Sequence, residues 1–368
     1  MQKNMNYALL ILTNLLLLFT SYQAFSFQDI DKLLANPDIT WVGEVYVDYH
    51  PHINILAPES EDSKNQHETI DYNAIEILKI KKQVSDDQLS PLPTLLSSKI
   101  FELNSKNFNL YKEADLKEKL SYKAYQEIIQ QEVDEVKITF DPETYEQLIQ
   151  VIKIPLNTSH IKQFRLKQVL SYNSKTNELN ITPIALAPLQ SINKFGSLPE
   201  KALFWMPIKE AFTTINLDHA SIDWAKRFNK NISSDSIKTI KGTNNLSNLF
   251  IDMMTGYRTS PSTTKMYQIK HDHDQLIPFE PSFIQNIGIG LDTVISFNRE
   301  TFEEMIEIVD IRLAAKDLPK IRITQDWAWD NKTQRMQIRV VGFAPIIYKA
   351  DRNGNYSYTP FYYIRSKK

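Results

Sequence analysis

The chain repeats part of its own sequence at a spacing of 157 residues (295 minus 138, and 322 minus 165), and this repeat constrains the fold more than any other feature. Nearly every column of the matching segments agrees in identity or in chemical kind, without a gap. Two unrelated stretches would have to reproduce the same elements in order and in frame, so we interpret the match as an internal duplication. The matching segments are 138–152 with 295–309, 165–188 with 322–345, and Phe204-Trp205 with Phe361-Tyr362.

The repeat divides the chain into two tandem homologous units. The frame places the boundary near Phe204, so we predict a first repeat unit at 27–203 and a second at 204–368, after a signal peptide at 1–26. Trp41 and Trp205 are each expected to open a unit with a strand. Two domains also suit a chain of 368 residues, since one domain commonly takes about 100 to 200.

Each unit is predicted to contain an amphipathic helix after a short strand. Asp141 followed by Pro142 is typical of a helix N-cap with proline at the first helical position, and Asn298 takes the capping position in the second unit. The apolar residues that follow recur at helical spacing, which predicts one apolar face turned towards a sheet. These residues are Tyr145, Leu148, Ile149 and Ile152 in the first unit, and Phe302, Met305, Ile306 and Val309 in the second.

A strand pair is predicted after the helix in each unit. Polar turn residues at 173–177 and 330–334 indicate hairpins, whose strands alternate apolar and polar residues. Pro188 and Pro345 are expected to end the returning strands, because proline donates no hydrogen bond to a sheet. A further strand is predicted at 358–364. This order of elements indicates the α+β class, with two tandem units that are each a mostly antiparallel sheet packed with helices.

The first 26 residues predict export from the cytoplasm. One Lys, an apolar run at 8–19 and small residues before and at Ser26 form the pattern of a cleaved secretory signal peptide. An uncleaved anchor is the alternative, but the run is short of the ~20 residues that cross a bilayer. The absence of Cys suits a bacterial periplasmic protein. We therefore expect a periplasmic protein, cleaved near Ser26, with no direct membrane span.

Composition and motifs argue against several classes of function. With 42 Lys plus Arg against 44 Asp plus Glu, the chain lacks the basic excess that drives binding to nucleic acid. Only 8 glycines are present, and neither GxxxxGK[ST] nor GxGxxG occurs, so no nucleotide cofactor is expected. The absence of Cys excludes disulfides and thiolate metal sites. No GxSxG, HExxH or Ser-Lys motif is found, and we expect no enzymatic activity.

The segment His271-Asp272-His273-Asp274 is the one histidine cluster with the character of a metal site. Two imidazoles two residues apart in an extended chain could share a metal ion with neighbouring carboxylates. The first unit has no equivalent cluster, and a polar run after a strand is usually a solvated loop. We favour the loop, and metal binding stays an open alternative.

Aromatic residues are concentrated near the end of the chain. Trp327 and Trp329 suit a core better than a surface, whereas the strand at 358–364 suits docking, because a terminal strand is often the edge of a sheet. The candidate interaction residues are Trp327, Trp329, Arg339, Tyr358, Phe361, Tyr362 and Tyr363.

Three segments of the second unit resemble a known family. They read DWAWD at 326–330, RVVGFAP at 339–345 and PFYYIR at 360–365. These segments resemble the D-W-x-[FW]-D, R-I-I-G-I-A-P and F-W-x-Y-x-P closing pattern of the gliding-motility ring proteins, the GldN/PorN family. The resemblance implies a periplasmic component of the type IX secretion machinery of Bacteroidota, which assembles with a lipoprotein partner into a large ring under the outer membrane. It transfers no catalytic residue.

Three functions are compatible with these sequence features. The first is a non-enzymatic structural or assembly component of a cell-envelope machine, which forms a homo-oligomer and binds an envelope partner such as an outer-membrane lipoprotein. The second is a periplasmic ligand-binding module with a cleft between the two units. The third is an envelope hydrolase that uses Asp326 or His271.

Overall fold

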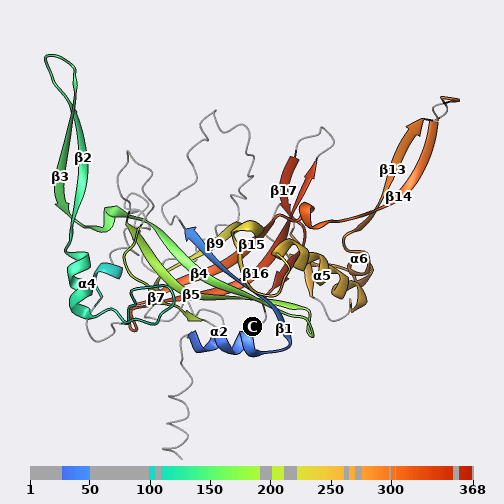
Figure 1. Ribbon diagram of the computed structural model, residues 1–368, viewed down its shortest axis with the longest axis horizontal. Coiled ribbons are helices and arrows are strands. Elements are labelled where there is room, and N and C mark those ends of the chain that lie inside the picture. The colour runs from blue at the N-terminus through green and yellow to red at the C-terminus, as the bar shows by residue number, and fades with distance from the viewer. Residues whose placement is uncertain are drawn as a thin grey trace, which may run out of the picture.

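Antiparallel strands form most of the protein, and helices are few. The computed structural model describes residues 27–49, 99–103, 109–190, 201–210, 222–260, 265–269, 276–297, 300–302, 304–350 and 356–366. The predicted signal peptide at 1–26 and the cluster at 271–274 lie outside these residues. Two large sheets make up the body, and two separate hairpins project from it (Figure 1).

The first sheet has its strands in the order β10-β1-β4-β5-β6, and β7 also pairs with β5. Its centre is the predicted hairpin at 173–177, where the Asn173 side chain accepts hydrogen bonds from the backbone N–H groups of Lys175 and Thr176. The strands are β1 (Ile39–Tyr49), β4 (Ile161–Asn173), β5 (Glu178–Gln190), β6 (Lys201–Ala202), β7 (Met206–Pro207) and β10 (Lys238–Lys241).

The second sheet has the order β12-β11-β18-β16-β15-β9, and β17 and β8 also pair with β16. Its central turn repeats that of the first sheet, since the Asp330 side chain accepts from the N–H groups of Lys332 and Thr333. The strands are β8 (Lys209–Glu210), β9 (Ile222–Ser233), β11 (Met266–Ile269), β12 (Leu276–Pro278), β15 (Lys320–Asp330), β16 (Arg335–Ala350), β17 (Tyr356–Pro360) and β18 (Tyr363–Arg365).

Short helices lie around the two sheets. Ser121 and Asn245 begin α4 and α5, because each side chain accepts a hydrogen bond from a backbone N–H in the first helical turn. Ile30 of α2 packs with Val42 and Val169 on the outer face of the first sheet. The helices are α2 (Phe27–Ala35), α4 (Tyr122–Ile129), α5 (Leu246–Thr259) and α6 (Pro281–Gln285), with single 3₁₀ turns at η4 (Thr158–His160), η5 (Ser234–Ser236) and η7 (Ala315–Asp317).

The spacing of 157 residues recurs in the backbone geometry. The pairing of β4 with β5 is shifted by a β-bulge between Lys167 and Gln168, and the pairing of β15 with β16 is shifted between Thr324 and Gln325. The last turn residues, Asn177 and Gln334, both have left-handed backbones with φ of 53° and 50°. Equivalent positions thus share irregular geometry as well as regular strands. The division at 203 and 204 stays a prediction.

The two repeats meet at a buried pair of equivalent glutamines. Gln325 Nε2 donates to Gln168 Oε1 at 2.6 Å, and these residues are 157 positions apart. Tyr49 Oη and Trp327 Nε1 both donate to Gln325 Oε1, at 2.9 Å and 3.2 Å. Inward-facing side chains of both sheets belong to one hydrophobic cluster around this pair, including Phe164. The sheets therefore share a single core.

The amphipathic helices predicted after Asp141 and Asn298 are wrong, because both regions are β-hairpins. The first is β2 (Glu132–Phe140) with β3 (Gln147–Pro155), and the second is β13 (Ile289–Phe297) with β14 (Glu304–Arg312). The residues assigned to one helical face are distributed over turns and strands instead. They are Tyr145, Leu148, Ile149 and Ile152 in the first hairpin, and Phe302, Met305, Ile306 and Val309 in the second.

Asp141 caps a turn in place of a helix. Its carboxylate accepts from the N–H groups of Glu143 and Thr144 at 2.8 Å and 3.0 Å, which is the local bonding that an N-cap would also make. Tyr145 then takes a left-handed backbone with φ of 59°, and Glu146 accepts from the Asp141 N–H to close the hairpin. The same side-chain bonds therefore begin a helix or close a turn, and the sequence pattern does not separate the two.

The two prolines expected to end strands do not end them. Strands β5 and β16 continue past Pro188 and Pro345, whose carbonyls accept from the closing segments at Leu203 and Phe361. In an antiparallel ladder the N–H and C=O of a residue point to the same side. Each proline therefore costs no hydrogen bond to β4 or β15.

The roles expected of Trp205 and of the final strand also change. Trp205 forms an isolated β-bridge with Tyr111. The residue equivalent to Trp41 in strand pairing is Trp224. Trp41 pairs with Tyr172, and Trp224 pairs with Trp329, which is the repeat equivalent of Tyr172. The predicted strand at 358–364 is two strands, and β18 lies between β16 and β11 instead of at an edge.

We expect Gly342→Ala to destabilise the protein, because a Cβ at this position would lie 2.5 Å from Tyr363 Oη and would also collide with the Ile364 carbonyl. Overpacking of this kind costs about 1–3 kcal/mol of unfolding free energy, measured by urea titration. Gly290→Ala is the matched control, since no atom lies within 4 Å of the added Cβ. Equal stabilities of the two variants would contradict the close approach of β16 and β18.

Candidate functional site

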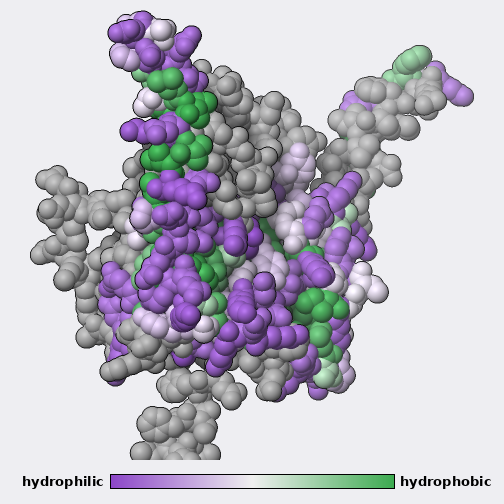
Figure 2. All heavy atoms as spheres, turned by 60° about the vertical axis from the view of Figure 1, so that its left-hand side comes forward, coloured by the Kyte–Doolittle hydropathy of each residue, from purple (hydrophilic) through white to green (hydrophobic). Residues whose placement is uncertain are grey.

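The two projecting hairpins expose large apolar side chains of the kind that a protein normally buries in its hydrophobic core. We name β2–β3 arm 1 and β13–β14 arm 2; they extend from the two ends of the molecule on the side opposite α2 (Figure 1). Figure 2 shows hydrophobic side chains along arm 1 outside the body. Ile149 in arm 1 and Ile306 in arm 2 are both 66% exposed, and these residues are equivalent in the repeat.

One face of each arm carries most of this apolar surface. Directly paired residues of an antiparallel hairpin lie on the same face, and Ile149 pairs with Ile138 while Val151 pairs with Val136. The equivalent pairs in arm 2 are Ile306 with Ile295 and Ile308 with Thr293. We call this surface the apolar arm face. Its exposed side chains are Phe140, Ile149 and Val151 in arm 1, and Ile306 and Ile308 in arm 2.

An aromatic residue stands at the tip of each arm. Tyr145 is 81% exposed and Phe302 is 80% exposed. Both have left-handed backbones, with φ of 59° and 58°, and they are equivalent in the repeat. A continuous exposed apolar surface on a β-hairpin is typical of a site for another protein.

Four of the predicted interaction residues lie inside the protein. Trp327, Trp329 and Tyr362 are buried in the shared core, and Tyr363 is buried on the second sheet. Burial raises the pKa of Tyr362, and its hydroxyl has no hydrogen-bond partner. These side chains pack against their own chain here, and an interaction role for them stays a prediction.

The other three predicted residues are partly exposed. Tyr358 stacks on Tyr348 with a distance of 4.8 Å between ring centroids, and the Lys320 ammonium lies 4.2 Å from the Tyr358 ring centroid. Phe361 packs at the margin of the shared core. Their proposed role in an interface stays a prediction as well.

Arg339 belongs to a charged group on the outer face of the second sheet. Asp326 accepts from Arg227 at 2.7 Å and 3.2 Å, and from Arg339 at 3.2 Å. The three residues lie directly opposite one another on β9, β15 and β16. Because two guanidinium groups hold the Asp326 carboxylate, it is poorly placed to act as a general base.

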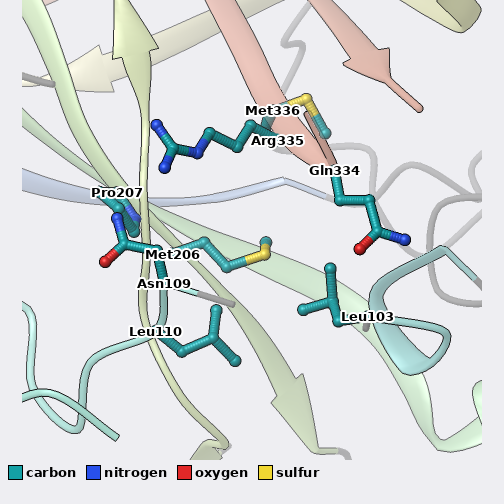
Figure 3. A pocket seen from close by; sticks show the side chains of 8 residues that line it. All are labelled: Leu103, Asn109, Leu110, Met206, Pro207, Gln334, Arg335 and Met336. Carbon is teal, nitrogen blue, oxygen red and sulfur yellow. The ribbon is translucent and has the colours of Figure 1, made fainter. Parts of the chain in front are cut away.

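A hollow between the two repeats is too small for a ligand. It is lined by residues from both halves of the chain, with Met206, Leu103 and Leu110 towards its middle and Gln334 and Arg335 on the opposite wall (Figure 3). Its cavity volume is about 10 Å³, which holds a single water, whereas ligand pockets have volumes of about 300–1,000 Å³.

The described residues contain neither a metal-binding cluster nor a membrane-spanning helix. Within the described ranges no group of three or more His, Asp or Glu side chains could hold a metal ion. No helix in this part of the chain has the length and apolar character to span a membrane.

The sequence contained a signal for the arms that helical spacing concealed. In β3 the apolar residues Leu148, Ile149, Val151, Ile152 and Ile154 are spread over both strand faces, which an isolated hairpin permits. Several of them are β-branched, and this composition favours strands over helices. Weighting β-branched residues would have predicted the hairpin.

Repeated strand pairing, a shared core and two exposed apolar arms define this chain as a β-rich protein with two projecting apolar hairpins. The family described as Gliding motility associated protein GldN matches residues 92–280 and, a second time, residues 221–367. Because the matches together cover more than half of the 368 residues, the chain belongs to this family. The resemblance seen in the sequence is thus confirmed. No curated protein matches the chain.

Asp326→Asn is expected to lower the unfolding free energy by about 1–3 kcal/mol, because Arg227 and Arg339 would lose the carboxylate that accepts their hydrogen bonds. Urea unfolding measures the change. Asp134→Asn, an exposed carboxylate on arm 1, is the control and should change stability by less than about 0.5 kcal/mol. An unchanged unfolding free energy in the Asp326→Asn variant would show that the ion pairs do not stabilise the second sheet.

The stability of the turn at the tip of arm 1 should depend on pH, because the Asp141 carboxylate accepts hydrogen bonds within it. Hydrogen bonds from the Thr144 and Glu143 N–H groups lower the pKa of the Asp141 carboxyl below its ordinary value. A lowered pKa in the folded turn means that the turn is stabilised above the ordinary pKa and loses this stabilisation as the pH falls through the lowered one. Carboxyl NMR titration should give a midpoint below that of an exposed aspartate in an unfolded peptide; an equal or higher midpoint would contradict the turn.

Proposed function

We propose that this chain is a non-enzymatic structural component of a bacterial cell-envelope machine, namely the periplasmic ring of type IX secretion and gliding motility. Membership of the GldN family supports a role in gliding motility. The observation that carries the structural role is the pair of apolar arm faces, present in both repeats at equivalent positions. A protein that displays such surfaces twice is suited to join other subunits.

The proposed location is the periplasm, after removal of residues 1–26 as a signal peptide. The proposed partners are further copies of the chain and an outer-membrane lipoprotein of the same machine. The resemblance of the closing motifs to the ring family supports both partners, and the two exposed arms supply surfaces on which they could dock.

The ligand-binding and hydrolase alternatives have less support. A binding module needs a cleft between the repeats, and the hollow found there has the volume of one water. A hydrolase based on Asp326 needs a free carboxylate, but both of its oxygens accept hydrogen bonds from arginines. His271 lies outside the described residues.

Affinity purification from the native envelope tests the proposed function. A tagged full-length chain, cross-linked in cells before extraction, should retain an outer-membrane lipoprotein and yield complexes much larger than one chain. A tagged periplasmic protein of similar size from another pathway serves as the control and should retain neither. If the chain is recovered alone, and its deletion leaves gliding and secretion intact, the proposed function is wrong.

A further inference from the structure

The arms differ from the rest of the chain in charge as well as in exposure. Residues 132–155 of arm 1 include six acidic and two basic residues, and residues 289–312 of arm 2 include the same numbers, so each arm has a net charge of −4. The rest of the chain then has 38 basic residues (42 less 4) and 32 acidic ones (44 less 12). Its net charge is +6, although the whole chain is at −2.

An apolar hairpin that projects alone needs a partner for its exposed face. Two strands without a third strand or a covering helix are marginally stable in water. Phe140, Ile149 and Val151 gain no burial from the body, although each is large and apolar. Covering this face removes apolar surface from water, which stabilises both the hairpin and the complex.

We propose that each apolar arm face docks on the basic body of a second copy of this chain. This inference rests on the proposed assembly role and names the contact that builds the assembly. Charge decides the occupant: without residues 1–26 and their one Lys, the body is at +5 (37 basic less 32 acidic), so it attracts an arm at −4, whereas two arms would repel each other. Contact between an arm and a body is therefore favoured over contact between two arms.

The placement of the arms supports repeated association. They extend from the two ends of one molecule, so one chain reaches two neighbours (Figure 1). An arm on one chain and a body on the next are different surfaces, and such head-to-tail contacts continue until a ring closes or a filament grows. Two identical chains joined through identical patches would instead stop at a dimer.

Sedimentation of the purified chain over a range of concentrations tests the contact. The double variant Ile149→Asn with Ile306→Asn removes one apolar side chain from each arm face and should raise the Kd of self-association at least about tenfold. Gln150→Asn is the matched control, because Gln150 is exposed on the opposite face of arm 1, where it pairs with Lys137. It should change the Kd by less than about twofold.

Salt separates the two modes of contact. Raising the ionic strength screens charges. It should therefore weaken the binding of an acidic arm to a basic body, and strengthen the binding of one acidic arm to another. Weaker association of the native chain in high salt supports the proposal, and stronger association overturns it. Urea unfolding of each variant checks that the body is intact, and Val151→Asn on the same face provides a second variant if the double one is unstable.

Failure of this inference differs from failure of the proposed function. A chain that stays monomeric at all concentrations, or whose association is unchanged by Ile149→Asn with Ile306→Asn, overturns docking on a second copy. If such a chain still retains a lipoprotein from the envelope, and the arm variants lose it, the arms bind that partner instead. The proposed function would then stand without this inference.

Discussion

The arrangement of both sheets depends on the hydrogen bond between Gln325 and Gln168. A buried amide without a partner destabilises a core, and here two equivalent amides meet at β-bulges that occur at the same place in each repeat. Tyr49 and Trp327 donate to the same oxygen of Gln325. Gln168 Nε2 makes no hydrogen bond to any described residue, so the contact depends on the two glutamine oxygens, and a slip of either sheet would break the bonds to them.

A shared core determines which apolar residues remain for other proteins. Trp327 and Trp329 belong to the segment 326–330 that resembles a family motif. Both lie in this core, and so they stabilise the chain itself. Strands β7 and β10 follow residue 204 but pair with β5 and β1 of the first sheet, which joins the sheets further. The hairpins at 132–155 and 289–312 contribute little to the core beyond Val133, and Ile149 and Ile306 on them stay exposed.

The sequence predicted the duplication and the central hairpins well, because both depend on local residue types that recur in frame. It failed at Asp141, where the same side-chain hydrogen bonds serve a helix cap and a tight turn. It also could not place Gln168 beside Gln325, since that contact joins residues 157 positions apart. The arms were misassigned because apolar residues on both faces of a strand imitate helical spacing when no core distinguishes the faces.

The two repeats are expected to unfold as one cooperative body around the glutamine pair. Hydrogen exchange measured by mass spectrometry during a urea titration tests it most directly. Peptides from β4 and β15 should lose protection at the same urea concentration, while peptides from the arms exchange early. Separate midpoints for β4 and β15 would mean that the repeats fold independently, and would contradict the shared core.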